Sequence, residues 1–384
     1  MKKIQHNHSH CAICKHQENC NGLPYFWPVF CFVGCETTEA LRKNLEFLKV
    51  VDETLIERPE PLWTTESKIR IELDTVRLRD FSKKQNKSGI YTLILAPYAG
   101  HTSQIADYDT GQSLVETFQK NRTKKVAVTD WKSATNETKD YSIDNYLDSV
   151  DACVDELGGV ANLVGLCQGG WLGAMYSARF PEKVNTLTLA GSPIDTDAGE
   201  GQIKEFVHNY PMSFYEELVA MGNGVLKGEF MLRGFKNMHP GKQYVEKYAE
   251  LYKNVDDPEY IKKFEKFESW YEYTIDLPGK FYLQVVKELF KENRLVKGEF
   301  IGLEKRLDLK DIKCPVYLLA GERDDITPVE QVLNAEKYVG TNKKNIKKDI
   351  ADGGHIGLFM GHKPLEMNWP KIVKWVRKHS RAEA

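Results

Sequence analysis

The sequence predicts an α/β fold with a mostly parallel sheet, helices on both faces and a helical insertion. Two observations carry this prediction. From residue 69 onward, short apolar stretches alternate with amphipathic stretches of helical length, and strands joined by crossover helices build parallel sheets covered on both faces. The alternation stops after Asp195 and resumes at Cys314, which indicates that a helical segment interrupts one domain.

The strand predictions rest on periodicity and length. Residues 69–78 alternate as a strand for most of their length, and the remaining candidates are short apolar runs. These are residues 91–96, 125–129, 163–166, 186–190 and 315–320. Helices are predicted between and after them, at residues 111–119, 143–157, 169–180 and 369–379.

Three regions are predicted along the chain. Residues 1–60 form a Cys- and His-rich N-terminal appendage, residues 61–195 plus 311–384 form the core, and residues 196–310 form a helical cap insertion. Within the insertion, residues 258–271 and 280–292 are amphipathic over helical lengths. An insertion at this place in such a fold covers the active site.

Charge and hydropathy exclude two classes of partner. Lys and Arg number 53 against 55 Asp and Glu, a net charge of -2, so no electrostatic footprint for nucleic acid is present. No run of 18 apolar residues occurs, so no transmembrane segment is expected. We therefore expect a cytoplasmic protein whose cysteines are reduced.

The appendage mixes residues that bind zinc in other proteins, namely His6, His8, His10, Cys11, Cys14, His16 and Cys20. One interpretation is a small metal-bound knuckle. The favoured interpretation is a tail with fortuitous ligands, because only one C-x-x-C pair is present and no second pair follows at the usual distance. No metal site is therefore predicted.

The strongest motif is Gly165-Leu166-Cys167-Gln168-Gly169, placed between an apolar strand and an amphipathic helix. A nucleophile elbow has this form, because the sharp turn leaves little room for side chains two residues before and after the nucleophile. The Cys167 sulfur would then lie at the positive end of the following helix, which favours the reactive thiolate. A buried cysteine in a Gly-rich turn is the alternative for the pentapeptide alone.

Two further loops decide between these interpretations. Asp324 follows a late strand, in Gly321-Glu322-Arg323-Asp324, and His355 lies in a glycine-flanked loop before the last helix. The chain order nucleophile, acid, histidine is that of the α/β-hydrolase fold. His355 is predicted to act as the base and Asp324 to orient it. Asp325 is expected to point to solvent.

Acyl chemistry at Cys167 needs two donors for the oxyanion. The backbone N–H of Gln168 is one candidate. The second is expected from the loop Ala96-Pro97-Tyr98-Ala99-Gly100-His101, with Tyr98 and Ala99 as the candidates. His101 is assigned either to substrate binding or to the turn itself.

From about residue 90 to 375, the chain resembles the polyhydroxyalkanoate synthases and the intracellular polyhydroxyalkanoate depolymerases. The synthase-like segments are residues 165–170, with the form G-x-C-x-G-G, and residues 293–299, 307–312 and 354–357. The depolymerase-like segments are residues 96–101, 281–284, 321–326 and 359–361. In the depolymerases the cysteine is usually followed by Gln-Pro, whereas here Gly169 follows Gln168.

The resemblance implies a Cys167-bound hydroxyacyl thioester formed from hydroxyacyl-coenzyme A, with no cofactor besides this substrate. It also implies a polyester granule as a binding partner, and a second synthase subunit or a homodimer. The alternative activity is hydrolysis of the polyester or its oligomers by the same triad. A third hypothesis is a non-catalytic granule-binding protein, motivated by the aromatic segment around Phe26 and Trp27.

Overall fold

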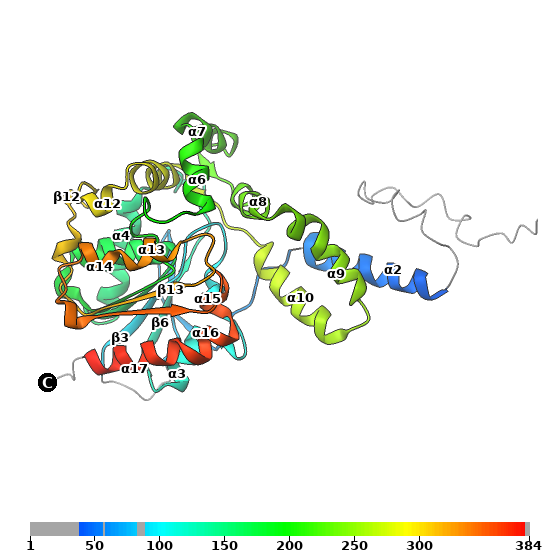
Figure 1. Ribbon diagram of the computed structural model, residues 1–384, viewed down its shortest axis with the longest axis horizontal. Helices are drawn as coiled ribbons and strands as arrows, with labels where there is room; N and C mark the ends of the chain where they lie inside the picture. Colours follow the sequence, from blue (N-terminus) through cyan, green and yellow to red (C-terminus); the bar gives the residue numbers. More distant parts are fainter. Residues whose placement is uncertain (1–37, 57, 83–88, 381–384) are drawn as a thin grey trace, which may run out of the picture.

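The computed structural model describes residues 38–56, 58–82 and 89–380, and its centre is an eight-stranded sheet (Figure 1). The strand order is β1-β2-β6-β3-β7-β8-β13-β14. All pairs from β6 to β14 are parallel, and β1 and β2 form an antiparallel edge. The bounds are β1 (Lys68–Glu72), β2 (Val76–Asp80), β3 (Tyr91–Leu95), β6 (Val126–Trp131), β7 (Ala161–Leu166), β8 (Val184–Ala190), β13 (Val316–Gly321) and β14 (Ile346–Ala351). The predicted mostly parallel sheet is confirmed.

The prediction of one strand at residues 69–78 is wrong. This segment is the hairpin of β1 and β2, closed by a hydrogen bond from Leu73 N to Val76 O at 2.8 Å. The alternation of apolar and polar residues continues through the turn, so the pattern does not indicate that the chain reverses direction there. Strand β14 was not predicted, because it is an edge strand whose exposed Lys347 and Lys348 interrupt any apolar run. Charged residues on an edge strand oppose pairing with other chains.

Helices cover both faces of the sheet. On one face, α3 (Leu114–Lys120) packs against α17 (Trp369–His379). On the other face, α4 (Ile143–Glu156) packs against α5 (Gln168–Arg179). The helices α13 (Val329–Leu333) and α14 (Ala335–Tyr338) contact each other and lie on the same side of the sheet (Figure 1). The bounds of α4, α5 and α17 agree with the predicted helices to within one residue.

Between β8 and β13 the chain is mainly helical. It forms α6 (Gln202–Asn209), α7 (Met212–Met221), α8 (Gly228–Met238), α9 (Lys247–Lys253), α10 (Pro258–Tyr271), α11 (Gly279–Gln284) and α12 (Arg294–Lys297). The predicted bounds of α10 are confirmed. The helix predicted at residues 280–292 is α11 continued by a π-helical stretch, Val285–Lys291.

Part of this helical segment, together with α2 (Thr38–Val51) from before the sheet, projects from the core as an arm (Figure 1). The arm consists of α2, α9 and α10, which share a small apolar core separate from the main one. That core contains Phe47, Val50, Leu251, Val255 and Phe264. The described end of the N-terminal appendage therefore packs against the insertion. The three predicted regional boundaries themselves stay predictions.

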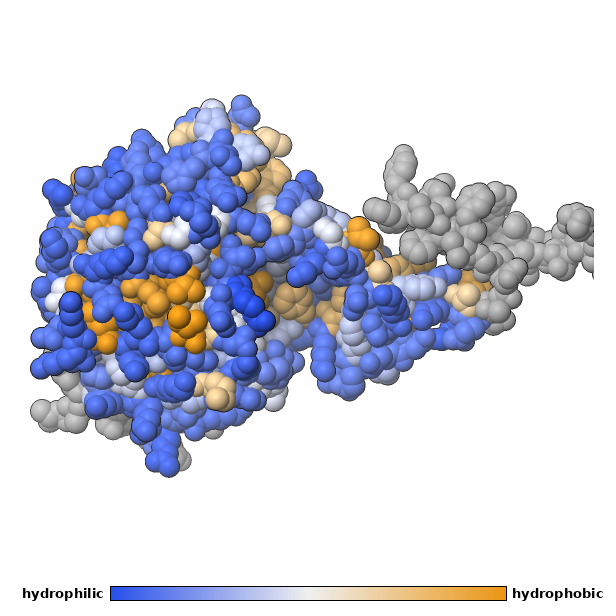
Figure 2. Space-filling view, in the orientation of Figure 1, coloured by the Kyte–Doolittle hydropathy of each residue, from blue (hydrophilic) through white to orange (hydrophobic). Residues whose placement is uncertain are grey.

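The molecular face in Figure 2 is largely hydrophilic, and hydrophobic side chains gather over the part of the core where Figure 1 labels α14 and β13.

Within the described ranges, no helix is both long enough and apolar enough to cross a bilayer. The same residues contain no cluster of three or more His, Cys, Asp or Glu suited to a metal ion. The zinc-type residues 6–20 and the aromatic pair Phe26 and Trp27 lie outside the described residues.

Candidate active site

Cys167 stands in a strained turn between β7 and α5. Its backbone has φ 51° and ψ −117°, a conformation that non-glycine residues rarely adopt and that marks nucleophile elbows. A Cβ on Gly165 would lie 2.4 Å from Gly170 Cα, and one on Gly169 would lie 2.1 Å from the Leu95 carbonyl oxygen. Both glycines of G-x-C-x-G are therefore required by contact distance.

Gly170, the third glycine of the motif, is required because of a different neighbour. A Cβ on Gly170 would lie 1.7 Å from Ser192 Oγ. The Ser192 hydroxyl in turn donates to the carbonyls of Ala190 at 3.2 Å and Gly165 at 3.4 Å. The Cys167 N–H donates to Ala190 O at 2.9 Å. The end of β8 therefore holds the elbow against its neighbouring strand.

Asp324 and His355 come from the loops that follow β13 and β14. Because the carboxyl ends of parallel strands meet at one edge of the sheet, these loops lie beside the elbow. His355 Nδ1 lies 2.8 Å from Asp324 Oδ2. Asp324 Oδ1 accepts hydrogen bonds from the N–H groups of Ile326 at 3.0 Å and Thr327 at 2.8 Å. The carboxylate is thus fixed in place, and its bond to Nδ1 leaves Nε2 for another partner.

Cys167 is that other partner. Burial by itself lowers the pKa of His355, but the charge of Asp324, the charge of Cys167 and hydrogen bonds to both residues raise that pKa well above 6.5. Cys167 and His355 are both buried, with exposed fractions of 8% and 9%. The structure therefore brings together the nucleophile, histidine and acid candidates as one hydrogen-bonded chain.

This arrangement predicts how His355 titrates. In Asp324→Asn, the charge that raises the pKa of His355 is gone while the burial that lowers it stays, so the pKa should fall. The stability gained from His355 is fully present below about pH 6.5 and is lost as the pH rises through the folded-state pKa. A pH titration of the His355 ring signals by NMR, in the unaltered protein and in Asp324→Asn, measures the change. Identical titrations in the two proteins would contradict the assignment of Asp324 as the partner.

Asp325 lies elsewhere, as an exposed residue. Its Oδ2 is 2.5 Å from His239 Nε2, at the C-terminal end of α8. This pair joins the core loop that carries Asp324 to the helical insertion. Asp325 is therefore positioned to connect the two parts of the chain, and Asp324 to contact His355.

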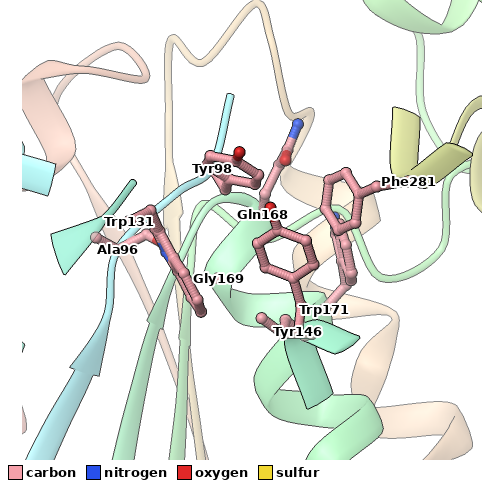
Figure 3. Close-up of a pocket in the computed structure, with 9 residues that line it drawn as sticks. Ala96, Tyr98, Trp131, Tyr146, Gln168, Gly169, Trp171 and Phe281 are labelled. Atoms are coloured by element: carbon pink, nitrogen blue, oxygen red, sulfur yellow. The ribbon is translucent and has the colours of Figure 1, made fainter. Parts of the chain in front are cut away.

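Of the residues predicted to supply the oxyanion donors, Gln168 and Tyr98 line one cavity, and Ala99 is not part of its lining. Gln168 is the first residue of α5, and the end of β3 packs directly on the following Gly169. Ala96, Tyr98 and Gln168 line a small cavity of about 10 Å³ (Figure 3). The aromatic rings of Trp131, Tyr146, Trp171 and Phe281 also line it (Figure 3), together with Gly169 and Leu172.

The side chain of Tyr98 belongs to this aromatic cluster. Its hydroxyl donates to the carbonyls of Lys132 at 3.1 Å and Asp276 at 3.0 Å, and its ring lies 4.9 Å from that of Tyr146 between centroids. Tyr98 is buried. Ala99 follows it as a half-buried residue. Any contribution of Tyr98 and Ala99 to the oxyanion would therefore come from backbone N–H groups.

His101 is placed against the insertion. Its ring stacks on those of Trp270 and Tyr271 with centroids 5.1 Å away in each case, and Nε2 donates to Tyr271 O at 3.0 Å. Burial lowers the pKa of His101 to about 4, so the ring is neutral near pH 7. Gly100, with φ 86°, makes the turn that precedes it. These contacts join the β3 loop to α10.

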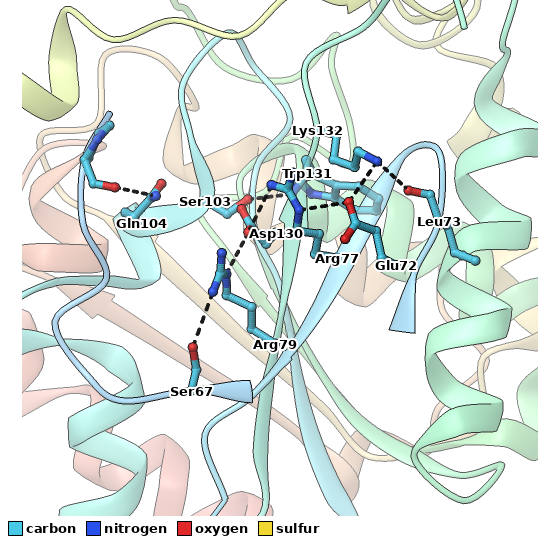
Figure 4. Close-up of polar contacts among 11 residues, drawn as sticks. Ser67, Glu72, Leu73, Arg77, Arg79, Ser103, Gln104, Asp130, Trp131 and Lys132 are labelled. Atoms are coloured by element: carbon cyan, nitrogen blue, oxygen red, sulfur yellow. Dashed lines mark hydrogen bonds and ion pairs between the residues drawn. The ribbon is translucent and has the colours of Figure 1, made fainter. Parts of the chain in front are cut away.

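Polar contacts connect the segment after this loop to its neighbours (Figure 4). Ser103 Oγ accepts from the Trp131 N–H at 3.0 Å, and Gln104 Nε2 donates to Pro61 O at 2.9 Å. The Arg79 guanidinium donates to Asp130 at 2.7 Å. The loop after β3 is thus anchored to the end of β6 and to the segment that precedes β1.

Two residues of the site were not predicted. The ring of Phe359 meets the His355 ring edge to face, with centroids 5.4 Å apart. Ser192 supports the elbow from the loop after β8. Phe359 lies in a segment already singled out by its resemblance, residues 359–361, whereas Ser192 has no local sequence signal because its contacts come from another strand.

The fold and the elbow place the protein in the α/β-hydrolase class. Over 79% of its length the chain aligns with 99% of the monoacylglycerol lipase of Paleococcus ferrophilus, with a TM-score of 0.50 and 17% sequence identity. A likeness at this identity establishes the fold. The chain belongs to the family described as "Protein of unknown function (DUF3141)", whose model matches residues 89–363.

Curated relatives confirm the resemblance found in the motifs. The chain is 28% identical over 299 residues to the poly(3-hydroxyalkanoate) polymerase subunit PhaC of Haloferax mediterranei, a match that covers 76% of this chain and 58% of that protein. It is 29% identical over 295 residues to the protein of the same name from Allochromatium vinosum, over 75% and 79% of the two chains. The chain thus spans less than two thirds of the Haloferax relative. These homologues and the hydrolase fold support an enzyme.

Proposed function

We propose that the protein is a polyhydroxyalkanoate synthase-like acyltransferase that uses Cys167 as its nucleophile and hydroxyacyl-coenzyme A as its substrate. The observation that carries the proposal is a cysteine, and not a serine, at the elbow, hydrogen-bonded to a histidine that is held by Asp324. Homology to polymerase subunits supports the choice of substrate.

The reaction follows from the positions of these groups. The Cys167 sulfur attacks the thioester carbonyl, the bond from that carbon to the coenzyme A sulfur breaks, and His355 protonates the departing thiolate. The hydroxyl of a second hydroxyacyl group then attacks the Cys167 thioester while His355 takes its proton. An ester bond forms, and Cys167 is released. The N–H of Gln168 and one N–H of the 98–99 segment would stabilise the oxyanion in both steps.

The second candidate function is hydrolysis of the polyester or its oligomers. The segment Ala96-Pro97-Tyr98-Ala99-Gly100-His101 favours it, because this loop resembles that of the intracellular depolymerases. The triad would be the same, with water in place of the attacking hydroxyl.

The word "subunit" in the names of the relatives motivates an assay with and without a second synthase subunit. A homodimer and an association with granules in the cytoplasm are part of the same proposal.

The test supplies 3-hydroxybutyryl-coenzyme A in one tube and amorphous polyhydroxybutyrate in another, each with the unaltered protein and with Cys167→Ala. Free coenzyme A, polymer and released hydroxy acid are followed in both. We expect Cys167-dependent release of coenzyme A with polymer growth. Hydroxy acid from the polymer tube alone would establish the hydrolase and contradict the synthase. Inactivity in both tubes, with and without a second subunit, would contradict both.

A further inference from the structure

A cleft lies away from the candidate triad, and four of its eight lining residues are cations. Its volume is about 420 Å³, and its walls are Val296, Lys297, Gly298, Arg306, Asp308, Lys310, Lys337 and Tyr338. The elements that carry these residues, α12, β12 (Lys305–Arg306) and α14, lie on the side of the core opposite the arm (Figure 1). Two segments singled out by their resemblance, residues 293–299 and 307–312, thus meet here and not at Cys167.

The charge of the cleft contrasts with that of the chain. Four cations face one carboxylate in the cleft, whereas the whole chain has a net charge of -2. Two of the cations hold backbone oxygens: Lys297 donates to Glu292 O at 2.6 Å, and Arg306 donates to Gly298 O. Among the described residues, no carboxylate lies within ion-pair distance of any of the four, and Asp195, which accepts a hydrogen bond from Tyr338, interacts with Lys337 only through its charge. The lining of the cleft therefore carries an excess of positive charge.

The walls of the cleft are held in place. The Tyr338 hydroxyl donates to Asp195 Oδ2 at 2.8 Å, and Asn293, just before α12, donates to Asp195 Oδ1 at 2.9 Å. Asp308 Oδ1 accepts from the Lys310 N–H at 2.9 Å, which fixes the turn that carries Lys310. The backbone on each side of the cleft is thus positioned by contacts that leave the Lys310 and Lys337 ammonium groups exposed.

We propose that this cleft binds the diphosphate group of a small phosphorylated molecule. Its volume is in the range of small-molecule sites. Lys and Arg side chains are the usual protein ligands of phosphate oxygens, and an excess of three positive charges complements a diphosphate. An inorganic diphosphate, a nucleotide and coenzyme A share this chemistry. The proposal does not depend on the acyl chemistry, because no triad residue lines the cleft.

The test is calorimetric titration of the full chain with pyrophosphate, ADP and coenzyme A in separate runs at low salt. We expect saturable binding that weakens as salt is added. The double variant Lys310→Gln, Lys337→Gln should weaken it at least about tenfold. The matched control is Lys374→Gln, Lys378→Gln on α17, which makes the same change of charge at two other exposed lysines and should bind as the unaltered protein does.

All these lysines are exposed, and melting curves verify that each variant is folded. The absence of saturable binding to the unaltered protein with all three probes would overturn the proposal. An equal loss of affinity in both double variants would also overturn it, as would unchanged affinity in Lys310→Gln, Lys337→Gln. Among positive results, the relative affinities separate the sources: ADP tighter than pyrophosphate indicates a nucleotide, and coenzyme A tighter than ADP indicates coenzyme A.

Discussion

Cys167→Ala is expected to lower the rate of coenzyme A release from hydroxyacyl-coenzyme A by about 10⁴-fold or more. The reason is that neither of the other two cysteines in the described part of the chain can replace its thiol. Cys153 is buried in the core, and burial raises its pKa to about 12. Cys314, before β13, likewise has a pKa raised by burial to about 12. Steady-state release of coenzyme A, followed with a thiol reagent, measures the effect.

The matched control is Cys314→Ala, which removes a thiol away from the elbow and should leave the rate within about twofold. The rate of coenzyme A release by Asp324→Asn should lie between the rates of Cys167→Ala and Cys314→Ala. This variant keeps the Cys167 thiol but removes the carboxylate that orients His355. If Cys167→Ala retained a tenth or more of the rate while remaining folded, Cys167 would not be the nucleophile.

Gly169→Ala is expected to destabilise the protein by more than about 3 kcal/mol or to prevent folding. The added Cβ would lie 2.1 Å from the Leu95 carbonyl oxygen and 2.9 Å from that of Ala96. Both oxygens belong to the backbone at the end of β3, so no side-chain rotation relieves the contact. Thermal or urea unfolding of the purified variant, or its absence from the soluble fraction, measures this.

Gly234→Ala is the control for the same chemical change. Gly234 lies within α8, is exposed, and a Cβ there would meet nothing within 4 Å. Alanine at such a position stabilises a helix by about 0.5 to 1 kcal/mol. A Gly169→Ala protein as stable as Gly234→Ala would show that β3 and α5 are farther apart than this structure places them.

The sheet and the meeting of the three candidate triad residues could be predicted because their sequence signals are local. Each parallel strand apart from β14 is a short apolar run. Cys167, Asp324 and His355 each follow a strand in a loop of recognisable composition. Loops that follow the carboxyl ends of neighbouring parallel strands lie at the same edge of the sheet, so their meeting can be predicted without knowing how the side chains pack.

Other features depend on contacts between distant segments and have no local signal. Phe47 and Val50 pack against residues 251–264 in the arm, and no pattern within residues 38–51 predicts this contact. The aromatic cluster around Tyr98 gathers residues from five places in the chain. The cationic cleft likewise forms only when α12, β12 and α14 meet. The hairpin of β1 and β2 was concealed by an alternation that runs through its turn.

The most direct test of the account is to identify the residue that carries the acyl group. The protein is mixed briefly with 3-hydroxybutyryl-coenzyme A, quenched in acid and digested, and the peptides are analysed by mass spectrometry. We expect a hydroxybutyryl group on the peptide that contains Cys167, released by hydroxylamine as a thioester is, and absent from Cys167→Ala. Continued turnover with Cys167 unmodified, or a stable adduct on another residue, would contradict the account.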